Sequence, residues 1–207
     1  MKTKIEIKSV FGSVLFEHES ENNSIKKTLE EAVKSKAYLC NADLRNADLV
    51  GADLRNAYLV GADLRNADIR NADLCNADLR DANLRNTNLV CADLRNADIR
   101  NADIRNAYLC GAYIVGAHLR YADLRDANLG EEWGKIESPQ DVLCVGCIGS
   151  RDAYTTIFHT DKGIFVQCGC FRGTLDEFAQ KVKETHKGTK YERDYNALIE
   201  FAKIKFS

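Results

Sequence analysis

The sequence of 207 residues lacks an excess of either charge, a long apolar run and, apart from one residue, proline. Lys and Arg number 29 against 31 Asp and Glu, and this balance argues against a basic nucleic-acid-binding protein and an acidic tail. No apolar stretch approaches the roughly 18 residues of a membrane span, and the N-terminus does not resemble a signal peptide. We therefore expect a cytoplasmic protein whose eight cysteines are reduced thiols or metal ligands, not a disulfide framework.

A five-residue repeat fills residues 37–131 without a gap, in 19 copies. Its first position is Ala in 18 copies, with Thr87 the exception, and its third is Leu in 15 and Ile in four. A helix needs apolar residues every 3.6 positions and a flat strand every two, so this pattern favours short strand segments joined by turns. A repeat too short to bury its own Leu must stack on further copies, which predicts a solenoid.

These repeats follow the pattern A(D/N)LXX and resemble the pentapeptide-repeat family over 95 of 207 residues. The resemblance implies a mainly β fold, a right-handed quadrilateral β-helix in which four repeats make one coil. The order of the flanking segments also resembles pentapeptide-repeat proteins of phage and prophage genomes, a resemblance that implies no biochemical role.

Four repeats per coil would place residues 20 apart in columns, in a stack roughly 23 Å tall at strand spacing. We call the four inward Leu/Ile columns the first to fourth sides, and the Ala residues keep the interior narrow. The first side contains Leu39, Leu59, Leu79, Ile99 and Leu119, and the second Leu44, Leu64, Leu84, Ile104 and Leu124. The third contains Leu49, Ile69, Leu89, Leu109 and Leu129, and the fourth Leu54, Leu74, Leu94 and Ile114.

One outward column on the second side consists of arginines, with mostly aspartates two residues earlier. Stacked arginines about 5 Å apart repel by about 1 kcal/mol per neighbour in water, and adjacent carboxylates offset this. We expect a solvated, self-neutralised ion-pair lattice; the alternative is a recognition face for an anionic or protein partner. The candidate binding residues are Arg45, Arg65, Arg85, Arg105 and Arg125, beside Asp43, Asp63, Asn83, Asp103 and Asp123.

Uncharged side chains gather at outward positions near both ends of the repeats. Exposed apolar patches usually mark contacts, and we expect the flanking segments of the same chain to cover these patches. A homodimer or partner interface is the alternative, with Tyr108, Tyr113, Val115 and Tyr121 as its candidate residues. The two clusters are Tyr38, Cys40, Val50, Tyr58 and Val60 near the start, and Tyr108, Cys110, Tyr113, Val115 and Tyr121 near the end.

The flanks predict three domains: a β-hairpin and capping helix in 1–36, the β-helix in 37–131, and a small α+β domain in 132–207. The hairpin should occupy 1–22, and a helix 24–36 should cover the first coil, because solenoids need polar caps. The C-terminal domain should contain strands 142–149, 153–159 and 164–170, a helix 174–186 opened by a Thr174–Glu177 capping box, and a helix 190–205.

Four C-terminal cysteines form a zinc candidate, because thiolates bind zinc tetrahedrally. The odd spacing of Cys144 and Cys147 would send them to opposite faces of a straight strand, whereas Cys168 and Cys170 would share a face. Buried cysteines usually behave as small hydrophobes, and we expect that here, with no metal and no cofactor. A stretch around Gly146–Arg151 that could cradle a phosphate is a weak nucleotide candidate.

The sequence therefore predicts a non-enzymatic protein-binding scaffold. The resemblance to phage proteins implies a phage-encoded modulator of a host or defence protein. One alternative is a DNA-mimicking inhibitor or protector of topoisomerase (gyrase), as the best-studied family members are. Duplex DNA would carry roughly 14 charges over about 23 Å. Residues 37–131 contain 13 Asp, one Glu and 11 Arg, a net of only −3. The second alternative is binding of a nucleotide or small ligand by the C-terminal domain.

Overall fold

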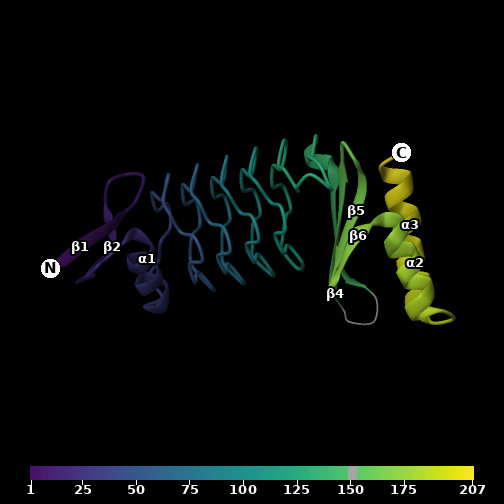
Figure 1. Ribbon diagram of the computed structural model, residues 1–207, viewed down its shortest axis with the longest axis horizontal. Coiled ribbons are helices and arrows are strands. Elements are labelled where there is room, and N and C mark those ends of the chain that lie inside the picture. Colours follow the sequence, from purple (N-terminus) through teal and green to yellow (C-terminus); the bar gives the residue numbers. More distant parts are fainter. Residues whose placement is uncertain (149–152) are drawn as a thin grey trace.

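The computed structural model describes residues 1–148 and 153–207, with the side chains of Cys147 and Ala153 also outside the description. The molecule is elongated: an N-terminal hairpin and helix lie at one end, a stack of coils in the middle, and a sheet with two helices at the other end (Figure 1). Among the described residues, no helix combines the length and apolarity needed to cross a membrane.

The middle of the molecule is a four-sided solenoid with 20 residues per coil. Isolated parallel bridges join residues 20 apart, from Tyr38 with Tyr58 to Tyr108 with Asn128. The Leu and Ile residues of all four sides are buried, as are the Ala residues from Ala42 to Ala127. Thr87 is fully buried in the place of an Ala, and its hydroxyl donates to the Leu84 carbonyl at 2.6 Å. The predicted inward columns and the coil length are therefore confirmed.

Corners form because the fifth residue of each repeat adopts a left-handed backbone. Every fifth residue from Asn41 to Asp126 has a positive φ, and the amide of the next Ala donates to the preceding Leu or Ile carbonyl. A type II turn requires this conformation, which Asn and Gly adopt with the least strain. Cys91 and Tyr121 adopt it too, with φ of 58° and 63°.

The hairpin and first helix lie beside the first coil. Strand β1 (Lys2–Lys8) pairs antiparallel with β2 (Val14–Glu21), and helix α1 (Ile25–Lys34) is capped by Ser24. The Lys8 carbonyl accepts from the Asp43 amide at 2.7 Å, and the Val10 amide donates to the Asn41 carbonyl. These two backbone groups of the first coil are thereby paired within the chain.

A four-stranded antiparallel sheet packs against the last coil. The short helix η1 (Pro139–Asp141) leads into β3 (Val142–Ile148), β4 (Ala153–Thr160), β5 (Gly163–Cys168) and β6 (Phe171–Thr174), in the spatial order β3-β4-β5-β6. Phe158 and Phe165 face the solenoid core, and Trp133 stacks on Phe165 at 4.9 Å. Strand β6 was not among the predicted strands.

The other face of the sheet carries two helices, α2 (Leu175–His186) and α3 (Lys190–Lys205). Ile157 and Val166 pair across β4 and β5 and pack with residues of both helices. Thr174 and Glu177 form the predicted capping box. The sheet thus separates two cores, one shared with the solenoid and one with the helices.

Candidate interaction surfaces

The arginine column on the second side is bound by carboxylates of its own coils. Arg45 donates from Nε and Nη2 to Asp43 at 2.7 and 2.6 Å, and Arg125 makes the same bidentate contact with Asp123. Each pair fixes a long side chain against the backbone, because the Asp also accepts from the amide of the Arg. The guanidinium groups of the four paired arginines, Arg45, Arg65, Arg105 and Arg125, are therefore held in one geometry while their side chains stay 34 to 49% exposed.

Neighbouring coils are also linked by charge. Arg45 Nε lies 3.8 Å from Asp63 of the next coil, and Arg105 Nε lies 3.6 Å from Asp123. The hydrogen bonds from Arg105 hold the pKa of the Asp103 carboxyl below its usual value, against the opposing effect of partial burial. These contacts form the expected ion-pair lattice.

Arg85 interrupts this lattice at the centre of the column. Asn83 stands where the other coils have Asp, so Arg85 has no carboxylate in its own coil. Its nearest carboxylate is Asp103, at 3.9 Å from Nε, and this buried Nε has no hydrogen-bond partner. The break was visible in the sequence as one Asn in a column of Asp residues, but its consequence for Arg85 follows only from the geometry.

The tyrosines near the end of the solenoid remain exposed. Tyr108, Tyr113 and Tyr121 are 52, 55 and 73% exposed, so the expectation that flanking segments cover them is wrong for these side chains. The bridges place Tyr108 on the third side and Tyr113 on the fourth, followed two residues later by the half-buried Val115. Tyr121 lies at the corner after the first side, so the four candidate residues do not form one patch.

Two tyrosines near the start of the solenoid are exposed as well. Tyr38 and Tyr58 are 74 and 41% exposed, and their rings lie 5.3 Å apart on the first side. The smaller side chains of this cluster, Cys40, Val50 and Val60, are half-buried. Covering by the flanks is therefore incomplete at both ends.

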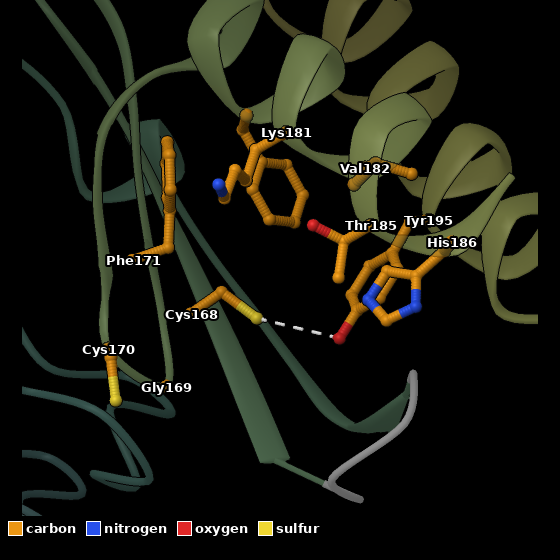
Figure 2. Close-up of a pocket in the computed structure, with 10 residues that line it drawn as sticks. Cys168, Gly169, Cys170, Phe171, Lys181, Val182, Thr185, His186 and Tyr195 are labelled. Carbon is orange, nitrogen blue, oxygen red and sulfur yellow. Dashed lines mark hydrogen bonds between the residues drawn. The ribbon is translucent and has the colours of Figure 1, made fainter.

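The structure does not bring the zinc candidates together. Cys144 on β3 contacts Thr156 on the solenoid face of the sheet, whereas Cys168 on β5 accepts from Thr155 at 3.0 Å on the helix face. The sulfurs of Cys168 and Cys170 point in different directions (Figure 2), and the Cys147 side chain lies outside the described residues. One zinc ion cannot be bound by thiols on opposite faces of a sheet.

A different group of potential ligands lies on the fourth side, where Cys75 replaces an Arg. Ligand atoms of Asp73, Cys75 and Asp93 lie within 4.8 Å of one another, the only such group among the described residues. Burial first, and then the hydrogen bonds to Asp93 and Asp73, raises the pKa of the Cys75 thiol to about 12. Asp93 is already bound by Arg95, so the thiol completes a neutralised lattice as a hydrogen-bond donor.

The C-terminal domain contains a small cavity between the β5–β6 turn and the helices (Figure 2). Its volume is about 210 Å³, and Cys168 lies 3.8 Å from the Tyr195 hydroxyl inside it. The His186 ring lies 5.5 Å from that of Tyr195. Sites for drug-sized ligands occupy roughly 300 to 1,000 Å³, so the cavity does not favour a nucleotide. The phosphate candidate 146–151 lies partly outside the described residues.

Comparison with known proteins gives the solenoid a family. Pentapeptide repeats, in eight copies, match residues 35–71, 67–106 and 92–130. The chain is similar to Rfr23 of the cyanobacterium Cyanothece 51142, with 36% identity over 42% of this chain and a TM-score of 0.31. It covers 56% of Rfr23, little more than half of that protein.

Two structures from Nostoc PCC 7120 are also similar. The pentapeptide repeat protein alr5209 is 38% identical over 49% of this chain and 77% of its own, with a TM-score of 0.33. HetL, involved in regulating heterocyst differentiation, is 32% identical over 46% of this chain and 54% of its own, with a TM-score of 0.26. No curated protein matches the chain. Through the repeats of residues 35–130, the chain belongs to the pentapeptide-repeat family.

Proposed function

We propose that this protein is a non-catalytic scaffold that binds another protein through the arginine column of its solenoid. Arg85 is the observation that carries the proposal, because its side chain is 42% exposed and its own coil supplies Asn83 where the other coils supply a carboxylate. Its neighbours Arg65 and Arg105 are held in place by Asp63 and Asp103. A carboxylate of a partner would complete the lattice there, between two arginines whose side chains are already ordered.

A protein partner suits this surface better than a nucleic acid does. The chain carries a net charge of −2, so it lacks the excess positive charge with which proteins attract a duplex. Arginine and tyrosine are enriched where proteins bind one another, and Tyr108 and Tyr113 are exposed on the third and fourth sides. Pentapeptide-repeat proteins are generally interaction or structural proteins, which agrees with a non-enzymatic role.

The same proposal includes the organisation of the chain. Residues 1–36 act as the cap of the first coil, 37–131 as the binding solenoid, and 132–207 as a C-terminal domain covering the last coil. The cytoplasmic location and the phage origin, with a host or defence protein as target, remain predictions.

Affinity capture with charge-reversal variants tests the proposal. Tagged protein captures partners from nuclease-treated bacterial lysate, and mass spectrometry compares wild type, Arg85→Glu and Arg70→Glu. Arg70 is the matched control, because it lies on the third side, is similarly exposed and is bound by Asp68. A stoichiometric protein retained by Arg70→Glu and lost by Arg85→Glu, at unchanged Tm, is the expected result. A partner set that is identical for all three proteins would refute the role of the column.

A further inference from the structure

The last coil of a solenoid exposes backbone amides and carbonyls that a following coil would pair. In this protein, other segments of the chain pair some of these groups on three of the four sides. On the fourth side, the Gln167 amide accepts from the Ile114 N–H at 3.1 Å and donates to the Ala112 carbonyl at 3.0 Å. On the second and third sides, residues 134–136 exchange hydrogen bonds with 126–129. The chain thus substitutes for a missing coil around much of the edge.

No described segment takes that place on the first side and at the beginning of the second. In the earlier coils the corresponding amides pair with the coil that follows, and so do the corresponding carbonyls from Ala42 onward. Within residues 1–148 and 153–207, five backbone groups of these two sides that a following coil would pair have no hydrogen-bond partner. They are the amides of Leu119, Tyr121 and Leu124 and the carbonyls of Ala117 and Ala122.

A groove opens at this part of the edge. It has a volume of about 810 Å³ and lies between residues 119–124 of the last coil and residues 139–144. Strand β3, which contributes to its far wall, is an edge strand of the sheet. Leu119, at 9% exposure, is the most exposed inward Leu or Ile of the solenoid. Both walls therefore combine apolar side chains with a strand edge.

The groove also carries a cation without a carboxylate. His118 stands where the two preceding coils have Asp78 and Asp98. Arg120 instead packs over the Tyr121 ring and donates to its hydroxyl at 2.8 Å. No described carboxylate lies within ion-pair distance of Arg120. Elsewhere, an arginine of one coil approaches the Asp 18 positions later, as Arg105 approaches Asp123 at 3.6 Å. The equivalent Asp for Arg120 would belong to whatever occupies the groove.

We infer that this groove binds an extended acidic–apolar segment of a partner protein, which adds as a parallel strand to the last coil. The ladder of the solenoid fixes its register. One residue with a carboxylate pairs with Arg120, and the apolar residue after it covers Leu119. The five unpaired backbone groups each gain a hydrogen bond. Strand addition is a common mode of peptide recognition, and the charge of Arg120 selects an acidic sequence.

A synthetic peptide with the sequence of residues 97–106, ADIRNADIRN, is the probe, because that segment pairs with 117–126 in the coil above. Bound in the same register below the last coil, its two Asp amides would donate to Ala117 and Ala122. The amide of its first Ile would point away from the protein. Fluorescence anisotropy of the labelled peptide with the full chain measures binding.

Methylated peptides separate strand addition from simple charge attraction. Methylation of both Asp amides should weaken binding by at least about tenfold, since each removes a hydrogen bond. Methylation of the first Ile amide is the matched control and should leave the affinity within about twofold. No saturable binding of the parent peptide at about 1 mM, a weak Kd by any standard, would overturn the proposal, as would equal loss with both methylated peptides.

Exchanging the charges of Arg120 and of the peptide tests the ion pair between them. The Arg120→Glu variant should bind the parent peptide at least about tenfold more weakly than wild type does. The same variant should bind more tightly to a peptide in which the first Asp is replaced by Lys. Arg45→Glu, in the first coil, is the control and should change neither. Self-association of the chain that Arg120→Glu abolishes would assign the groove to a second copy and overturn a partner segment. These variants leave Arg85 intact, so this proposal and the proposed function can fail separately.

Discussion

At the residue scale, the corner position of the repeat shows how one backbone angle selects residue types. Asn, Asp and Gly fill most of these corners, because other residues strain when φ is positive. Asn side chains also bond along the corner column, as Asn66 donates to Asn46 at 3.3 Å and Asn86 to Asn66 at 3.2 Å. Cys91 and Tyr121 give up both advantages, so each is a position where stability is not optimal.

Cys91→Asn should therefore stabilise the protein by about 0.5 to 1 kcal/mol, since Asn tolerates the left-handed backbone better. Space is available, because the same arrangement of Asn over Gly occurs where Asn96 lies beside Gly116. Thermal unfolding followed by circular dichroism measures the gain. Asn96→Cys is the reverse control and should destabilise by a similar amount; a lower Tm for Cys91→Asn would contradict the argument.

The inward ladder is tested by a polar substitution. Leu84 is 1% exposed in the narrow interior, so Leu84→Asp would bury a carboxyl without a partner. We expect a cost of at least about 4 kcal/mol and loss of the folded state. Circular dichroism and size-exclusion chromatography report the outcome. Arg85→Asp, the outward neighbour, should stay folded. A soluble, folded Leu84→Asp protein would contradict the inward assignment.

At the scale of elements, the ion-pair lattice links the coils through side chains as well as backbone. Every Asp that binds an Arg two residues later also accepts from its amide, so the side-chain lattice and the turn share one acceptor. Exposed pairs contribute little individually. We expect their contribution to stability to come from the repetition of many such pairs along the stack.

The lattice predicts a pH dependence. The Arg partners lower the pKa of Asp103 and of Asp123 below the ordinary 3.8, so the folded state binds these protons less readily than the unfolded chain. Their contribution is complete above the unfolded pKa and is lost as pH falls through the folded pKa. The Tm should be nearly constant above about pH 5 and fall below about pH 4, less steeply in high salt. A Tm unchanged down to about pH 2.5 would contradict this.

Local repetition was predictable from the sequence, and long-range pairing was not. The period of five and the strict Ala and Leu positions predict which side chains point inward, because each repeat meets the same environment. The placement of Cys144 and Cys168 on opposite faces of the sheet could not be predicted, because it depends on how β3, β4 and β5 pair. The role of Gln167 was missed, because its partners Ala112 and Ile114 lie more than 50 residues away. Strand β6 was missed as a short segment of four residues.

At the scale of the whole molecule, the charge distribution separates this solenoid from an imitation of DNA. A duplex is uniformly anionic, whereas the carboxylates here are bound by arginines on the same sides. The exposed surface of the solenoid therefore alternates in sign over a few ångströms.

A supercoiling assay with purified gyrase tests this directly. We expect no inhibition and no protection from quinolones at a large molar excess of the protein, because the surface lacks the continuous negative charge of DNA. A known DNA-mimicking inhibitor is the positive control. Inhibition that scales with protein concentration would restore topoisomerase as the target.

The coil length of exactly four repeats has a consequence for how such a chain can change length. Insertion of 20 residues adds one coil and lengthens the molecule by about 4.8 Å, and the C-terminal sheet keeps its orientation. Insertion of five residues instead turns everything beyond it by a quarter of a revolution. The distance between the N-terminal hairpin and the C-terminal sheet and their relative orientation are therefore set independently. Duplication of near-identical repeats in the gene can supply both kinds of step.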